Sequence, residues 1–166
     1  MGAHEIPGGS VEWYTPQYIF DSLECRFDMD VAAAPQGFGC VPADILCRDA
    51  FNTIWIGFVW CNPPWSGRGK KQQWIDKMYL HGNGILLTPD RTSAPWWQDV
   101  TKKSDSLLMI NHKIKFTPGT NNLSNWKQPG CGSTLFAFGE KGISAITNAE
   151  NNGLGIVLNK RNYAAN

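Results

Sequence analysis

The run Asn62-Pro63-Pro64-Trp65 is the part of the sequence best suited to chemistry. It follows a bulky apolar segment at 55–61 (WIGFVWC), which predicts a strand that stops abruptly. Consecutive prolines lack N–H groups and restrict φ, so the chain leaves the strand stiff and extended. The Asn62 side-chain oxygen and the Pro63 carbonyl then form two fixed acceptors for an amine, and Trp65 offers a face for an aromatic substrate. A strand-ending turn beside a core tryptophan is the simpler alternative.

Basic side chains follow this motif and could hold a phosphate backbone. The net charge is only +1, so a polyanion surface depends on local clustering. The glycine-containing segment 66–71 (SGRGKK) and a basic residue after the next predicted strand supply such a cluster. The candidate contacts are Ser66, Arg68, Lys70, Lys71 and Arg91. An ordinary solvated loop is the alternative, and for the weaker patch at Lys113 and Lys115 a solvated surface is the favoured interpretation.

The composition indicates an ordinary globular protein without a metal or redox centre. With 166 residues, 42% of them hydrophobic and 17% charged, the chain is expected to form one domain. The five cysteines contain no CxxC pair and the three histidines are scattered, which argues against a zinc site. An odd number of cysteines and the lack of a signal peptide or a membrane-length apolar run favour a reducing cytoplasm.

The elements that must position the motif are predicted from the spacing of apolar residues. Thr15 is expected to cap a helix whose first residue is Pro16. Strands are expected at 27–33, 55–61, 84–89, 107–116, 133–139 and 155–158, helices at 72–81 and 96–103, and loops at 34–42 and 117–132. Residues 145–148 show no clear pattern. Strands that alternate with helices predict an α/β sheet with ligand-binding loops at the carboxyl ends of its strands.

The motif and the segments around it resemble the small phage-type DNA N6-adenine methyltransferases of the Dam family. The resemblance rests on five segments in this order: 12–16 (EWYTP), 27–33 (FDMDVAA), 49–51 (DAF), 59–65 (VWCNPPW) and 86–97 (LLTPDRTSAPWW). It implies a single-domain, Rossmann-like class I methyltransferase sheet with helices on both faces. This domain would span residues 11–166, after a flexible tail at 1–10.

The resemblance also implies how S-adenosylmethionine would be bound. Thr15 and Pro16 would contact its methionine end, Asp30 would lie by the methionine amino group, and Asp49 and Phe51 would frame its adenine. The full set of candidate cofactor-binding residues is Trp13, Thr15, Pro16, Asp30, Ala32, Ala33, Asp49, Ala50, Phe51 and Asn62. One departure is that the segment after the first strand reads AAPQGFG, without the Gly-x-Gly loop usual in class I methyltransferases.

The implied reaction transfers a methyl group to N6 of an adenine that has left the DNA duplex. The catalytic residues would be Asn62, Pro63, Pro64 and Trp65, acting by positioning and by fixed acceptors, with no metal. Asn at position 62 favours adenine over N4 of cytosine. The expected partner is double-stranded DNA, bound by a monomer or homodimer in the cytoplasm of a bacterial host, with a phage or prophage origin.

Three alternatives remain open on the sequence alone. Amide methyltransferases that act on a protein glutamine also use Asn-Pro-Pro-Tyr, although they usually carry an extra substrate-binding domain and Trp65 replaces the expected tyrosine here. Methylation of adenine in RNA would need the same acceptors. A catalytically inactive DNA-binding relative would keep the fold without the activity, but the intact Asn62 argues against it.

Overall fold

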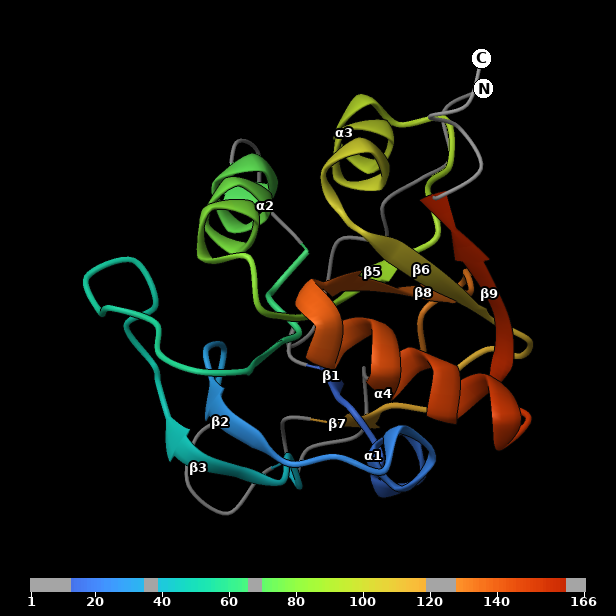
Figure 1. Cartoon of the computed structure of the whole chain (residues 1–166), viewed down its shortest axis with the longest axis horizontal. Coiled ribbons are helices and arrows are strands. Elements are labelled where there is room, and N and C mark those ends of the chain that lie inside the picture. The colour runs from blue at the N-terminus through green and yellow to red at the C-terminus, as the bar shows by residue number, and fades with distance from the viewer. Residues whose placement is uncertain (1–12, 35–38, 66–69, 119–127, 161–166) are drawn as a thin grey trace.

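The computed structural model describes residues 13–34, 39–65, 70–118 and 128–160, and within them the chain forms two sheets and four helices (Figure 1). The strands are β1 (Trp13–Tyr14), β2 (Phe27–Asp30), β3 (Ala43–Leu46), β4 (Val59–Cys61), β5 (Gly84–Pro89), β6 (Ser106–Ile110), β7 (Thr117–Pro118), β8 (Ser133–Phe138) and β9 (Gly155–Asn159). The helices are α1 (Gln17–Leu23), α2 (Lys70–His81), α3 (Pro95–Lys103) and α4 (Gly139–Asn151).

The main sheet has seven strands in the order β3-β2-β4-β5-β8-β6-β9. Strands β3, β2, β4 and β5 are parallel, whereas β8 is antiparallel to both β5 and β6. Strand β6 therefore runs in the same direction as β5, and the carboxyl ends of β2, β4, β5 and β6 share one edge of the sheet. This mixed α/β sheet with a parallel centre confirms the predicted fold class and is consistent with a Rossmann-like methyltransferase.

Helices cover both faces of the sheet, as predicted (Figure 1). On one face α1 and α4 pack their apolar side chains, among them Phe20 and Ile146, against inward residues of the central strands. On the other face α2 and α3 contribute Trp74 and Trp97, which lie in one cluster with Phe136 of β8. Strands β5 and β8 are buried on both faces, which explains the unbroken apolar runs at 85–87 and 135–138.

Four elements were not expected from the sequence, because tertiary packing creates them. The short strands β1 and β7 form a two-stranded sheet, and β7 lies at the start of the loop expected at 117–132. Strand β3 lies at an edge of the sheet and exposes most of its side chains, so its sequence lacks the apolar pattern of a buried strand. Helix α4 buries small residues, including Gly142 and Ala149, instead of a stripe of large ones. A Cβ atom on Gly142 would lie 2.9 Å from the Gly84 carbonyl oxygen, so the close approach of this helix to the sheet depends on a residue without a side chain.

Several predicted boundaries were wrong for identifiable reasons. The strand expected at 55–61 begins only at Val59, because Gly57 adopts a φ of 65° and the following Phe58 N–H donates to the Asp28 carboxylate. The strand expected at 107–116 ends at Ile110, and the chain re-enters a sheet only at β7. Thr15 makes no capping bond to α1, and Pro16 occupies the N-cap instead of the first helical position.

We predict that Gly84→Ala destabilises the protein by about 1–3 kcal/mol, because overpacking a rigid site forces backbone to move. A Cβ atom at this position would lie 2.6 Å from both the carbonyl oxygen and Cγ2 of Val59, at the pairing of β4 with β5. Urea denaturation measures the free energy of unfolding. Gly130→Ala is the matched control, since a Cβ there would meet nothing within 4 Å, and equal stabilities of the two variants would contradict this account of the packing.

Candidate active site

Asn62 lies immediately after β4, and its side-chain amide has a defined orientation. Its Nδ2 donates to the Trp13 carbonyl oxygen at 2.9 Å and to Thr15 Oγ1 at 3.2 Å. A carbonyl oxygen can only accept, so the nitrogen must face β1 and Thr15. The Asn62 Oδ1 atom is therefore directed away from these two groups, as an acceptor at the carboxyl edge of the sheet.

The rest of the motif is held by the second face of the sheet and by α3. Pro63 is buried and Pro64 is exposed. Trp65 donates from Nε1 to the Leu87 carbonyl oxygen at 3.0 Å, and its ring stacks on Trp96 with centroids 5.1 Å apart and planes at 23°. One face of Trp65 thus packs against Trp96, so the expected stacking of a substrate on Trp65 concerns the other face and stays a prediction.

Asp30 ends β2 and is a carboxyl group in an apolar setting, only 4% exposed. Burial raises its pKa to about 6, although the Ala32 N–H donates to its Oδ1 at 3.1 Å and opposes that effect. Asp30 pairs with Trp60 of the adjacent β4, two residues before Asn62. The structure therefore brings Asp30, Thr15 and Asn62 to one region of the carboxyl edge.

The turn that contains Asp49, Ala50 and Phe51 is anchored on α2. Lys77 donates to the carbonyl oxygens of Ala50 at 2.5 Å and Thr53 at 2.8 Å, and Trp55 Nε1 donates to the same Ala50 oxygen at 3.0 Å. The Phe51 ring packs on Trp74 of α2, with centroids 4.6 Å apart. Sequence reasoning missed Lys77, because its partners are 24 and 27 residues away and no local pattern connects them.

The carboxylate of Asp49, expected to bind the amino group of a cofactor's adenine, has a neighbour within its own turn. Both of its oxygens accept from Asn52 Nδ2, at 3.0 and 3.1 Å. Each carboxylate oxygen can accept more than one hydrogen bond, so this contact orients Asp49 and leaves it capable of accepting from a ligand. Its side chain is exposed, which agrees with a ligand-binding position at the surface.

Part of the predicted basic surface lies at the same edge. Lys70 is exposed at the start of α2, and Lys71 Nζ lies 5.9 Å from the centroid of the Trp96 ring. Arg91 is exposed after β5, the strand beside β4, and donates from Nη1 to the Asp90 carbonyl oxygen at 3.1 Å. Ser66 and Arg68 lie outside the described residues.

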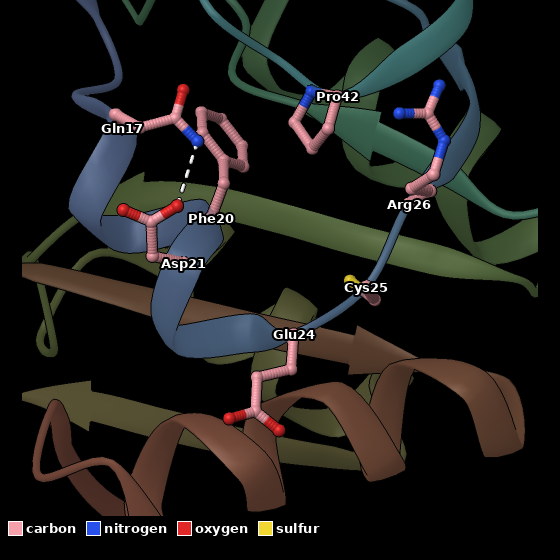
Figure 2. A pocket seen from close by; sticks show the side chains of 7 residues that line it. All are labelled: Gln17, Phe20, Asp21, Glu24, Cys25, Arg26 and Pro42. Atoms are coloured by element: carbon pink, nitrogen blue, oxygen red, sulfur yellow. Dashed lines mark hydrogen bonds between the residues drawn. The ribbon is translucent and has the colours of Figure 1, made fainter.

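A shallow surface pocket lies away from these residues, between α1 and the start of β2 (Figure 2). It is lined by Gln17, Phe20, Asp21, Glu24, Cys25, Arg26 and Pro42. Gln17 donates to Asp21 within it, and the exposed Arg26 forms an ion pair with Asp44. With two carboxylates at its rim, this pocket does not suit a phosphate backbone.

The described residues contain no group of three histidine, cysteine or acidic side chains that could hold a metal ion. Within the same part of the chain, every helix is too short or too polar to cross a membrane.

We predict that, without ligand, the Asp30→Asn variant gains stability relative to the wild-type protein as the pH increases. The folded-state pKa of Asp30 lies above its ordinary value of 3.8, so the stabilisation from protonated Asp30 is present below about pH 4 and is lost as the pH rises through about 6. The difference in the free energy of unfolding between variant and wild type should grow by about 3 kcal/mol from pH 4 to pH 8.

Denaturant titrations at several pH values measure this difference. Asp21→Asn, at an exposed position of α1, is the control and should show a far smaller change. A stability difference for Asp30→Asn that does not vary with pH would mean that burial leaves the pKa of this carboxyl near its ordinary value.

Comparison with known proteins yields one family. The model of the DNA N-6-adenine-methyltransferase (Dam) family matches residues 9–153, which include every described residue of the site above. No curated protein and no solved structure matches the sequence. The match covers most of the chain and agrees with a methyltransferase-like sheet whose carboxyl edge carries Asn62 and Asp30. The chain therefore belongs to the Dam family of DNA N6-adenine methyltransferases.

Proposed function

We propose that Asn62 Oδ1 and the Pro63 carbonyl bind the N6 amine of an adenine that has left the DNA duplex. The observation that carries this proposal is the orientation of the Asn62 amide, whose nitrogen is engaged by Trp13 and Thr15. An amide free to rotate could present a donor to the amine, whereas this one presents its oxygen. The base must leave the stack because its amine is not accessible within a duplex.

These acceptors act by holding the amine in a reactive orientation. Hydrogen bonds from its two protons to Asn62 and Pro63 draw the nitrogen out of conjugation with the ring and direct its lone pair toward the methyl donor. The acceptors are in place before the substrate binds, because the two prolines restrict the backbone and the Asn62 amide is anchored. Trp65, supported by Trp96, would stack on the base.

Membership of the family implies S-adenosylmethionine as the methyl donor, and the residues at the carboxyl edge fit it. When bound, this cofactor supplies a methyl group already activated on a sulfonium. Asp30 is a buried carboxyl whose ionised form is costly without a cation, so it suits the methionine ammonium group. The methionine end of the cofactor would be contacted by Trp13, Thr15 and Pro16. The small side chains of Ala32 and Ala33 would allow it to approach the backbone closely.

The adenine end of the cofactor would lie against the turn anchored on α2. Asp49 would accept from the cofactor's amino group, and Phe51 and Ala50 would contact its ring. Lys77 is then a positioning residue, since it holds the carbonyl groups on either side of Phe51 without contacting the ligand.

We predict that wild-type protein produces N6-methyladenine in DNA and that Asn62→Ala lowers this rate by at least about a thousandfold, because preorganised acceptors are lost. The measurement uses labelled S-adenosylmethionine, unmethylated duplex DNA and nucleoside analysis. Cofactor affinity, measured by calorimetry, should change by no more than a few-fold in the variant.

Thr15→Val is the matched variant, since it removes only one of the two acceptors of Asn62 Nδ2 and should slow the reaction by less than about tenfold. Recovery of 4-methylcytosine, or label only in protein, would refute the adenine assignment. A large loss of cofactor affinity in Asn62→Ala would instead place Asn62 in the cofactor site.

We predict that the two ends of the cofactor can be tested separately with 5′-methylthioadenosine, which keeps the adenosine part and lacks the methionine amino acid. Asp30→Asn should weaken the binding of S-adenosylmethionine by about tenfold and leave the binding of methylthioadenosine unchanged, because only the first ligand carries the ammonium group. Lys77→Met should weaken the binding of both ligands by the same factor, about tenfold, because it disturbs the turn that both would contact.

Calorimetric titrations of wild type and both variants with each ligand give the dissociation constants, and Lys141→Met, at an exposed position of α4, is the control. If Lys77→Met weakens the binding of S-adenosylmethionine but not that of methylthioadenosine, the turn at 49–53 does not bind the adenine. If wild-type protein binds neither ligand, the cofactor proposal itself fails.

A further inference from the structure

The segment between β6 and β7 packs along the part of the chain that anchors the catalytic Asn62. The Phe116 ring lies 6.1 Å from the Trp13 ring between centroids, and Thr117 pairs with Tyr14. The Trp13 carbonyl oxygen is in turn the acceptor of Asn62 Nδ2 at 2.9 Å. The carboxyl end of this segment, at Phe116 and Thr117, thus lies beside the strand that anchors Asn62.

The other end of this segment is tied to α1. The Tyr18 hydroxyl and His112 Nε2 are 2.8 Å apart, and His112 Nδ1 lies 2.8 Å from Asn111 Oδ1. An amide oxygen only accepts, so Nδ1 of a neutral His112 carries the proton and Nε2 accepts from Tyr18. Tyr18 is three residues after Thr15. Both ends of the segment, at His112 and at Phe116, therefore contact residues 13–18.

The side chains of this segment alternate between the core and the surface. Ile114 and Phe116 are buried in the cluster formed with α1 and α4, whereas Lys113 and Lys115 are exposed. Such alternation is typical of extended chain, in which residues two apart share a side. Gln128 holds the segment further, since its side chain both accepts from the Phe116 N–H at 2.9 Å and donates to the Phe116 carbonyl at 3.0 Å.

The charge of this region differs from that of the whole chain. Net charge is +1 overall, yet residues 106–139 contain three lysines and no aspartate or glutamate. Lys113 and Lys115 are therefore not neutralised by acidic residues of their own segment. Two exposed cations on a segment whose Phe116 is packed on Trp13 and held by Gln128 are suited to a polyanion.

We propose that Lys113 and Lys115 bind phosphates of one DNA strand next to the flipped adenine. Lys113 and Lys115 are both exposed and, being two residues apart in a segment whose burial alternates, lie on the same side of it. Both side chains can therefore reach one strand, and contacts with its phosphates would position the DNA without reading its sequence. This contact rests on the DNA methylation of the family and adds a second basic surface to that of Lys70, Lys71 and Arg91.

The salt dependence of DNA binding tests this proposal, because each phosphate contact contributes about 0.9 to the slope of log affinity against log salt. The double variant Lys113→Gln/Lys115→Gln should reduce that slope by about 1.8 and weaken binding of duplex DNA by about tenfold at moderate salt. Fluorescence anisotropy with an unmethylated duplex between 50 and 200 mM salt measures both. Affinity for S-adenosylmethionine, measured by calorimetry, should change by less than about twofold.

Two further variants make the result specific. Lys113→Arg/Lys115→Arg keeps both charges and should retain the wild-type slope, and Lys141→Gln, exposed on α4, should leave it unchanged. A wild-type slope in the glutamine variant would overturn the proposal, as would a loss of cofactor affinity without a change in slope. Failure of wild-type protein to methylate DNA would count against the proposed function, whereas methylation with an unchanged slope would count only against this contact.

Discussion

The hydrogen bonds from Asn62 Nδ2 to the Trp13 carbonyl and Thr15 Oγ1 are the interactions on which the active site depends. They join the end of the central strand β4 to β1 and to the chain that leads into α1. They also select which end of the amide faces the substrate. Because β1 pairs with β7, the same contact connects Asn62 with the segment that carries Lys113 and Lys115. In the proposed function, this one side chain links the regions that would bind the cofactor, the base and the phosphates.

Asp30 represents the opposite case, a residue whose proposed role opposes stability. A carboxyl group that is 4% exposed is costly to ionise, and the Ala32 amide compensates only in part. The same burial strengthens any ion pair that a cationic ligand forms there, because little water competes for the charge. In this interpretation the protein retains an unfavourable group in its free state that becomes favourable when the cofactor is bound.

Helix α2 connects two parts of the site that are distant in sequence. Its first residues, Lys70 and Lys71, extend from the basic segment after the catalytic motif, and its later Lys77 and Trp74 support the turn at 49–53. The sequence predicted this helix from its apolar spacing. It did not predict which groups the polar side chains of the helix bind. A lysine that donates to two carbonyl groups has no local signature, since backbone acceptors exist at every residue.

The sequence by itself determined the α/β alternation, strand β5 and the acceptor chemistry of Asn62-Pro63-Pro64, because apolar periodicity and proline geometry are local properties. Only the tertiary structure decided that Thr15 binds Asn62 instead of capping α1, that Trp65 packs on Trp96, and that α4 forms from small residues. Each of these outcomes depends on partners far away along the chain, 49 residues in the case of Asn62 and Trp13. Local patterns carry no information about such partners, so the chemistry was readable from the sequence and its orientation was not.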